Sequence, residues 1–385
     1  MKVVLSTIGK FHTFDLAREL QAHGALERIY SGYPAFKLKG EELPVGKVAT
    51  FPWIHGPYMA WPGRERLGPA FNQAWERLDS ILFDRYVAAR LPRCQVFVGL
   101  SGSALRTGRV AKRLGARYVC DRGSTHIRVQ DKLLREEHAQ WGVPFDGIAP
   151  HAIEREEQEY ASADCITVPS SFNVRSFIDQ GVPAHKIQRL PYGVNLGRFR
   201  PTRTPQADAF NVLFVGGMSL RKGLPYLMSA YKQLQHPRKS LTLAGAASPD
   251  FIRLLKAHQL WSDDIRVLGH VPQPELKDLM SSSHVMVLPS IEEGLAMVQA
   301  QAMACACPVI ATTHTGAEDL FTDGVDGFIA PVRSAHAITE KLQYLADHPD
   351  ERARMSAAAL QRVTQAGGWR DYGNRAMDIY RSLVP

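Results

Sequence analysis

Short apolar runs alternate with helical patterns along nearly the whole chain of 385 residues. Strands that alternate with helices predict βαβ units, parallel sheets, and ligand sites at the carboxyl ends of the strands. The predicted strands are Val3–Ser6, Val96–Leu100, Arg117–Asp121, Cys165–Pro169, Ile187–Leu190, Asn211–Val215, Ser240–Ala244, Ile265–Leu268, Val285–Leu288, Val309–Thr312 and Phe328–Ala330. The predicted helices include Asp15–His23, Leu224–Leu234, Asp250–His258, Pro274–Ser281 and the tail Ala358–Leu383.

A break in this alternation divides the chain, whose length already favours two domains. The segment Pro191-Tyr192-Gly193-Val194-Asn195 ends the first half, and a new strand–glycine–helix unit begins at Asn211. We therefore predict an α/β protein of two Rossmann-like domains, residues 1–193 and 194–365, whose parallel sheets face a cleft. The C-terminal helix, about residues 366–385, is expected to pack back on the first domain.

The composition is typical of a soluble globular protein, with 45% hydrophobic and 22% charged residues. No apolar run approaches the roughly 18–20 residues of a membrane span. The chain enters a strand almost directly after Met1, so no signal peptide is expected. The five cysteines lie mostly within apolar patterns and are expected to be reduced thiols of a cytoplasmic protein.

The net charge is +8, and most of the basic excess lies in residues 1–193. Three interpretations stay open: an anionic acceptor, a peripheral contact with an anionic membrane on its inner face, or no specific role. Nucleic acid is not an expected partner, because no recognised binding motif accompanies the charge. The aromatic segment Phe51–Arg64 is either an interfacial or acceptor-binding loop, or a loop whose rings fill the core.

The segment Ser290–Val309 carries the most informative functional pattern. A buried strand runs into Pro289-Ser290, then Glu292-Glu293, then Gly294, then a helix of small and apolar residues. Glycine at this junction lets a ligand approach the backbone, and the unpaired amides of the first helical turn favour negative charge. A carboxylate beside an anion site suits hydroxyl groups, so this pattern predicts a sugar joined to a diphosphate.

A second anion-binding pattern follows the first strand of the second half. There Gly216-Gly217 close the strand, and Arg221-Lys222 precede the next helix. We interpret this turn as a cradle that brings two cations to a diphosphate, the alternative being an ordinary turn with solvated cations. The spacing is not that of a P-loop. No convincing Asp-x-Asp is present, so no metal cofactor is expected, and the helix dipole and these cations must stabilise a departing diphosphate.

Polar residues also follow strands of the first half. Gly9 would let a ligand or the neighbouring domain come close, while Lys10 and His12 stay open between cleft and surface. The cluster Cys120–His126 lies at the end of a strand, where α/β proteins keep functional side chains. His126 is either structural or a residue that binds a sugar hydroxyl or buffers a proton. The acidic helix Glu154–Glu159 is interpreted as a solvated face.

Several of these motifs, in this order, resemble those of the retaining GT-B-fold glycosyltransferases called family 4, or group 1. The family pattern E-G-F-G-x-x-x-x-E-A-M-A-x-G-x-P-V is matched at Glu293–Ala296, Ala302–Ala304 and Pro308–Val309. The family's V-G-R-L-x-x-x-K-G is matched at Val215–Met218 and Lys222–Gly223. Two further matches are Ala163-Asp164 with Ser170, and Pro191–Asn195 with Phe199 and Pro201.

The resemblance implies roles for individual residues. Glu293 would hold donor-sugar hydroxyls, Lys222 would neutralise the diphosphate, and His126 would lie near the reacting sugar, so these three form the expected catalytic set. Residues near Val271 would edge the nucleobase. The expected donor-binding residues are Gly9, Gly217, Ser219, Arg221, Lys222, Val271, Glu293, Gly294, Leu295, Ala296, Met297 and Gln301.

The chain departs from the family pattern at three positions. The second glutamate, which usually grips the ribose, is Gln301 here; its amide can hydrogen-bond but lacks the charge that strengthens the bond. The family's arginine falls on Gly217, so Arg221 is expected to substitute for it. Ala296 replaces the second glycine of E-G-F-G and narrows the space at the backbone.

We therefore predict a metal-independent retaining glycosyltransferase of hexosyltransferase type. A nucleotide-diphosphate sugar would bind the second domain, and a glycan or lipid-linked acceptor would enter from the basic first domain. The departing phosphate would take the acceptor's proton. The family implies a role in bacterial surface polysaccharide, lipopolysaccharide or glycolipid synthesis, but the donor sugar, base, acceptor, linkage and oligomeric state do not follow from the motifs.

Two alternatives remain. A nucleotide-sugar epimerase would bring solvent deuterium into the sugar without any acceptor. A non-catalytic nucleotide-sugar-binding partner subunit would explain Gln301 and Gly217, and it predicts that Gln301→Glu changes nothing measurable.

Overall fold

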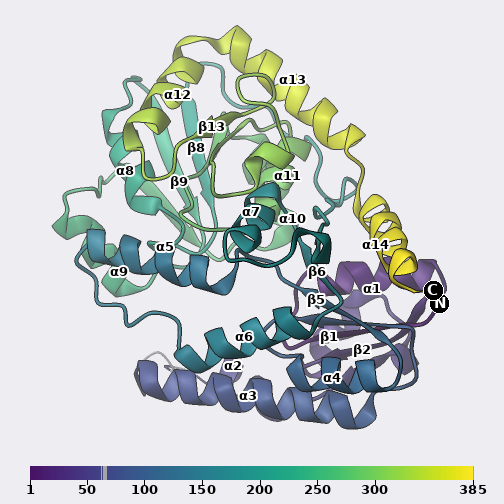
Figure 1. Cartoon of the computed structure of the whole chain (residues 1–385). Coiled ribbons are helices and arrows are strands. Elements are labelled where there is room, and N and C mark those ends of the chain that lie inside the picture. Colours follow the sequence, from purple (N-terminus) through teal and green to yellow (C-terminus); the bar gives the residue numbers. More distant parts are fainter. Residues whose placement is uncertain (62, 64–66, 385) are drawn as a thin grey trace.

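Two parallel β-sheets form the two halves of the protein in the computed structural model, which describes residues 1–61, 63 and 67–384 (Figure 1). The first sheet has the strand order β3-β2-β1-β4-β5-β6-β7, and the second has the order β10-β9-β8-β11-β12-β13. The prediction of two Rossmann-like α/β units is confirmed. The first sheet contains β1 (Val3–Thr7), β2 (Leu26–Ser31), β3 (Val48–Thr50), β4 (Val96–Leu100), β5 (Arg117–Asp121), β6 (Cys165–Val168) and β7 (Ile187–Arg189). The second contains β8 (Phe210–Val215), β9 (Lys239–Ala244), β10 (Ile265–Gly269), β11 (Val285–Leu288), β12 (Val309–Thr312) and β13 (Phe328–Ala330).

Helices cover both sheets (Figure 1). Those of the first half are α1 (Thr13–Ala22), α2 (His55–Ala60), α3 (Pro69–Arg90), α4 (Leu105–Arg113), α5 (Ile127–Gln140), α6 (Pro150–Ser162) and α7 (Ser171–Ile178). Those of the second half are α8 (Leu224–Gln233), α9 (Pro249–Ala257), α10 (Gln273–Ser281), α11 (Met297–Ala304), α12 (Ala335–Asp347), α13 (Pro349–Gln365) and α14 (Trp369–Leu383). Within the described residues, no helix combines the length and apolar character needed to cross a membrane.

The strand order of each sheet reverses at a switch point, between β1 and β4 in the first sheet and between β8 and β11 in the second. Open α/β sheets bind ligands at such points, because the loops that leave the two neighbouring strands diverge there. In the second sheet these loops are residues 216–223 and 289–296, which carry the two anion-binding patterns of the sequence. The topology thus brings the two patterns together.

The two strands β2 and β3 were not expected from the sequence. Strand β2 carries Glu27 and Arg28 at its second and third positions, and these charges interrupt the apolar run that marks a buried strand. Strand β3 is an edge strand of three half-buried residues. Both strands pair in parallel with their neighbours, so sheet pairing determines their conformation despite a weak local pattern.

The chain crosses between the two halves at two neighbouring places. A Cβ atom on Gly193 would lie 2.5 Å from the Trp369 nitrogen, so the first crossing packs directly against the start of α14. The helical tail predicted from the sequence is in fact two helices, because Gly367 adopts a φ of +82° and ends α13. Helix α14 packs on α1, and Tyr372, Met377 and Tyr380 join the core beneath it.

Helix α5 follows a strand of the first sheet but also packs on the second half of the chain. Leu133 and Trp141 contact the core of the second sheet, and the Trp141 ring meets the Tyr226 ring edge-on. Arg333 of the second half donates hydrogen bonds to Glu137 and to the Leu133 carbonyl. These contacts join the two halves on the side of α5.

The acidic helix Glu154–Glu159 was interpreted as a solvated face. This interpretation was wrong for two of its four glutamates. Glu156 and Glu159 are buried, and Glu156 forms an ion pair with the buried Arg122 at 2.9 Å. Glu159 accepts hydrogen bonds from the amides of Gly102 and Ala104. These carboxylates therefore hold the loop after β4 against α6, a role that the helical spacing alone does not reveal.

Removing the Tyr380 ring tests how strongly α14 stabilises the protein. Tyr380 is fully buried, and Tyr380→Ala is expected to lower the free energy of unfolding by about 3–5 kcal/mol, because it leaves a cavity. The Tyr380 hydroxyl has no hydrogen-bond partner among the described residues. Tyr380→Phe, the matched control, should therefore equal or exceed the wild type in urea denaturation. Equal losses in both variants would contradict this account.

Candidate donor-binding site

Two loops of the second half meet at the switch point between β8 and β11. The amide of Ile291 donates a hydrogen bond to the carbonyl of Arg221 at 2.8 Å. Gly223 adopts a φ of +63°, and a Cβ atom there would lie only 1.9 Å from the Pro289 carbonyl oxygen. Only glycine satisfies both the left-handed backbone and the close approach. The loop with Arg221 and Lys222 is thus fixed against the loop with Glu292 and Glu293.

Lys222 and Glu293 form an ion pair across these two loops. The Glu293 carboxylate also accepts a hydrogen bond from the Ser290 hydroxyl at 3.1 Å. The side chain of Lys222 retains 24% of its exposure and that of Glu293 10%, so the pair lies at the edge of the packed region. A cation suited to phosphate and a carboxylate suited to hydroxyls therefore occupy one place.

Helix α11 begins beside this pair with an uncapped first turn. Ala296 stands at the N-cap and offers no side-chain hydrogen bond. Within the described part of the chain, the amides of Met297 and Val298 have no hydrogen-bond acceptor, and Met297 is 37% exposed. Free amides at the positive end of a helix favour an anion. Leu295 and Ala296 are buried just before this turn.

Glu292 joins the two halves of the protein. Its carboxylate is fully buried and accepts hydrogen bonds from the Ser124 and Thr125 hydroxyls at 2.6 and 2.9 Å. Gln130 and Arg221 bind its second oxygen, each at 3.0 Å. Burial opposes ionisation, but Arg221 and the hydrogen bonds outweigh it and lower the Glu292 pKa to about 2. The guanidinium of Arg221 is thus held at the contact between the halves.

Gly294 lies in the same contact. A Cβ atom there would lie 2.0 Å from the Gly123 carbonyl oxygen, so the close approach predicted for a ligand is made by the first half of the chain. The Gly294 carbonyl accepts a hydrogen bond from Ser170 at 2.8 Å, and the Glu293 carbonyl accepts one from Asn173. The carboxyl ends of the two sheets therefore touch through these loops.

His126 is buried at the start of α5. Its Nδ1 accepts a hydrogen bond from the Arg128 amide, and its ring packs against Tyr160 and Phe177. Burial lowers its pKa to about 4, so the ring is neutral at pH 7 and carries its proton on Nε2. In the structure His126 caps helix α5. It lies two residues after Ser124, whose hydroxyl contacts Glu292. The catalytic role of His126 stays a prediction.

The remaining predicted residues surround these loops. Gly217 is exposed and Ser219 half-buried in the loop after β8, while Gln301 lies one turn into α11. Val271, which follows β10, packs at the edge of a hydrophobic core of the second half. Gly9 is buried after β1, in the first half. Among the described residues, no three His, Cys, Asp or Glu side chains form a group that could hold a metal ion.

Two residues left open in the first half have structural partners. His12 is buried and lies 2.7 Å from Asp121, with its ring packed on Tyr192. Lys10 forms an ion pair with Glu41. The partners of Glu292, above all Thr125 and Gln130, were missed from the sequence. The polar run after β5 was the only local signal for them, and it does not reveal a partner 167 residues away.

Solved structures share the whole fold. A sucrose-phosphate synthase from Thermosynechococcus elongatus is similar with a TM-score of 0.72 and 20% identity, and the match covers 100% of this chain and 99% of that one. Anabaena Alr3699/HepE in complex with UDP and glucose is similar with a TM-score of 0.73 and 17% identity, over 99% and 100% of the two chains. These neighbours define the class of the fold as GT-B.

Sequence comparisons place the second half more specifically. Residues 198–362 match the family model "Glycosyl transferases group 1", so this region of the chain is similar to the group 1 glycosyltransferases. A D-inositol 3-phosphate glycosyltransferase 1 from Catenulispora acidiphila is 30% identical over 262 residues, which are 62% of this chain. A D-inositol 3-phosphate glycosyltransferase from Streptomyces avermitilis is 30% identical over 220 residues, or 52% of this chain. The matched regions span 62% and 47% of the lengths of these two relatives.

Glu292→Gln tests whether the buried carboxylate stabilises the contact between the halves. At pH 7 we expect the variant to lose about 1–3 kcal/mol of unfolding free energy, because charge-assisted hydrogen bonds are lost. The depressed pKa stabilises the fold above pH 4.5, and this stabilisation is lost as the pH falls toward 2. The gap between wild type and variant should therefore shrink as the pH falls below 4.5 and should close near pH 2, where the Glu292 carboxylate becomes protonated.

Urea denaturation between pH 7 and pH 3 measures this gap. The matched control is Glu318→Gln, which also removes a carboxylate that pairs across the halves, with Arg175, but at an exposed site. This control should change stability by less than about 1 kcal/mol. A Glu292→Gln gap that does not depend on pH would contradict the assigned ionisation.

Proposed function

We propose that the protein is a metal-independent retaining glycosyltransferase that uses a nucleotide-diphosphate sugar. The observation that carries this proposal is the Lys222–Glu293 pair beside the uncapped first turn of α11. A diphosphate suits the lysine and the free amides, and sugar hydroxyls suit the carboxylate. The family match of residues 198–362 and the UDP and glucose bound to the HepE neighbour support this choice of donor.

In the proposed complex the diphosphate replaces Glu293 as the partner of Lys222. The released Glu293 carboxylate then accepts hydrogen bonds from the sugar hydroxyls. Leaving-group charge develops next to the Lys222 ammonium and the amides of Met297 and Val298, which stabilise it without a metal ion. The acceptor hydroxyl attacks on the face from which the diphosphate leaves, and a departing phosphate oxygen takes its proton.

Other predicted residues have narrower roles in the proposal. Arg221 acts by orienting Glu292, since its guanidinium already binds that carboxylate. Neutral His126 would donate a hydrogen bond from Nε2 to a sugar hydroxyl. Gln301 and Val271 would contact the nucleoside, and the exposed Gly217 leaves room for it.

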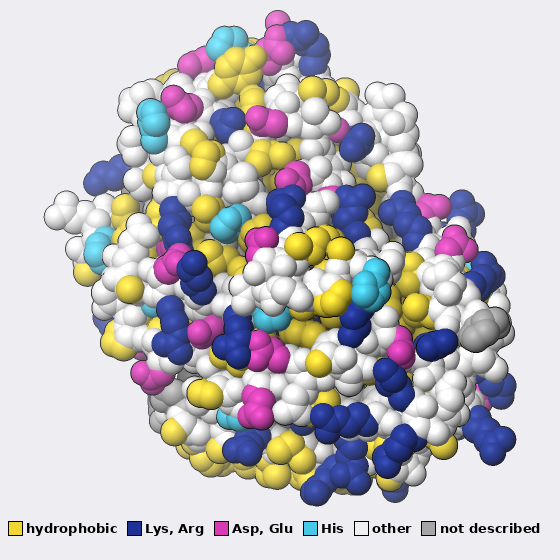
Figure 2. Space-filling model, in the orientation of Figure 1, with side chains coloured by type: hydrophobic (Ala, Val, Ile, Leu, Met, Phe, Trp, Pro, Cys, Tyr) yellow, Lys and Arg dark blue, Asp and Glu magenta, His cyan; other side chains and the backbone are white. Residues whose placement is uncertain are grey.

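We also propose a glycan or lipid-linked acceptor that enters from the first half, at the inner face of a membrane. The aromatic side chains of the segment Phe51–Arg64 are partly packed and partly exposed. Phe51 stacks on Tyr86, whereas Trp53 and Trp61 are 74% and 45% exposed. Pro62 and Arg64 lie outside the described residues. Figure 2 shows basic side chains over the lower part of the first half, with apolar ones along its edge. A surface of this composition suits an anionic interface.

A thermal-shift panel of UDP-, GDP-, ADP-, dTDP- and CMP-sugars, with EDTA present, tests the proposed function. A true donor at 100 times its Kd should stabilise the wild type by about 2.7 kcal/mol. Lys222→Ala and Glu293→Ala should abolish this shift. The control Lys232→Ala removes a cation at the far end of α8 and should retain it.

The alternatives give different outcomes in this panel. The absence of any shift would contradict the proposal, because it would mean that none of these nucleotide sugars binds the protein. A shift that requires a divalent ion would contradict the metal-free site. A separate incubation in deuterated water without acceptor tests for an epimerase, which would bring solvent deuterium into the sugar.

A further inference from the structure

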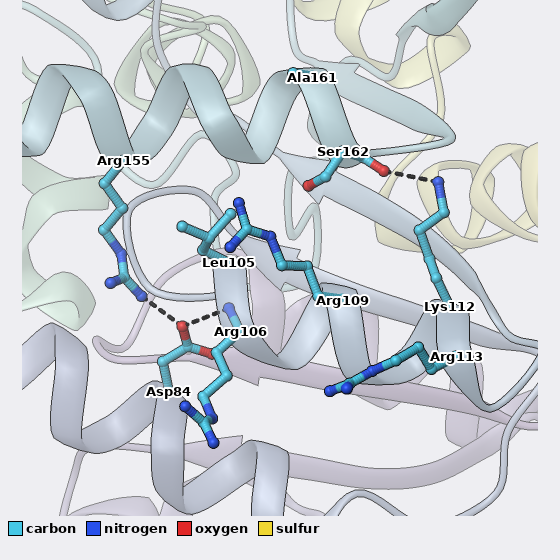
Figure 3. A pocket seen from close by; sticks show the side chains of 9 residues that line it. All are labelled: Asp84, Leu105, Arg106, Arg109, Lys112, Arg113, Arg155, Ala161 and Ser162. Atoms are coloured by element: carbon cyan, nitrogen blue, oxygen red, sulfur yellow. Dashed lines mark hydrogen bonds and ion pairs between the residues drawn. The ribbon is translucent and has the colours of Figure 1, made fainter.

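A basic cavity of about 750 Å³ lies between helices α3, α4 and α6 of the first half (Figure 3). Five cations line it: Arg106, Arg109, Lys112, Arg113 and Arg155. Asp84 is the only carboxylate among its lining residues. We propose that this cavity binds a linear oligoanion, a chain of phosphate or carboxylate groups. This binding does not depend on the proposed transfer reaction.

The cations come together because α4 has one face that must be buried. A Cβ atom on Gly108 would lie 2.5 Å from the Tyr118 ring, so this face packs tightly on β5. Arg106, Arg109 and Arg113 then share the opposite face at a spacing of three and four residues. Like charges at this spacing repel each other, and a bound anion would relieve that repulsion.

The single carboxylate of the cavity is already committed to the structure. Asp84 is buried and accepts hydrogen bonds from the amides of Arg106 and Thr107 at the start of α4. It also binds the Arg155 guanidinium at 2.5 Å, as Figure 3 shows. The negative charge of Asp84 therefore offsets the charge of Arg155 and the positive end of helix α4. The charges of the other arginines are left without a carboxylate from the cavity.

The outer cations have few competing partners. Arg109 donates to the neutral amide oxygen of Gln158, and Lys112 binds the Ser162 carbonyl and Asp164. Among the residues that the structure describes, the side chains of Arg106 and Arg113 form no ion pair or hydrogen bond. Both guanidinium groups are exposed and can bind an oxyanion with two parallel hydrogen bonds.

The length of the basic surface favours an extended ligand over a single ion. Arg106 and Arg113 are seven residues apart, or about 10 Å along a helix. A second cavity of about 600 Å³ shares Arg113 and adds Lys2 and Arg93, near the amino ends of β1 and β4. The surface therefore continues away from the strand ends that form the donor site.

Isothermal titration with tripolyphosphate and with a galacturonate tetramer tests the proposal and distinguishes phosphate from carboxylate chains. The wild type should bind at least one probe more tightly than orthophosphate or monogalacturonate. The double variant R106A/R113A should weaken this binding at least about tenfold, because two charge-assisted contacts are lost. Its melting temperature should equal or exceed that of the wild type, because repulsion falls and alanine favours the helix.

The matched control is R253A/K256A, which removes the same charge from exposed positions of α9 in the second half. It should bind the probe within about twofold of the wild type, because only screened, long-range attraction changes. Equal weakening in both double variants would overturn the proposal, since the attraction would then be general. Wild-type protein that binds neither probe but sediments with phosphatidylglycerol vesicles would also overturn it and indicate a membrane surface.

Discussion

The buried carboxylate of Glu292 is the interaction on which the arrangement of the two halves depends. It belongs to the loop after β11, yet Ser124, Thr125 and Gln130 of the first half supply most of its hydrogen bonds. A buried charge is tolerated only when it is fully bonded, so separating the halves would leave Glu292 without most of its partners. The neighbouring Gly294 allows the two backbones to approach closely enough for these bonds to form.

This contact also determines where a donor would bind. Glu293, next in the chain, pairs with Lys222 at the switch point of the second sheet. The same short loop therefore holds one carboxylate in the contact between the halves and presents the other beside the first turn of α11. A change in how the halves meet would therefore alter the proposed donor site directly.

Sequence patterns predicted the two parallel sheets from local periodicity, and they placed both predicted anion-binding patterns of the second half at the ends of strands. They did not predict strands β2 and β3, whose weak apolar patterns depend on neighbouring strands. The burial of Glu156 and Glu159 was also missed, because helical spacing does not show which face meets another element. For Gly294 the close approach was expected, but its partner, Gly123, lies 171 positions earlier in the sequence and could not be inferred.

Small-angle X-ray scattering of Gly294→Ala, compared with Gly217→Ala, tests the central claim most directly. A methyl group on Gly294 would collide with the Gly123 carbonyl, whereas one on Gly217 would meet no atom within 4 Å. The account predicts that Gly294→Ala separates the halves and increases the radius of gyration, while Gly217→Ala gives the wild-type curve. A Gly294→Ala curve that superimposes on the wild type would contradict it.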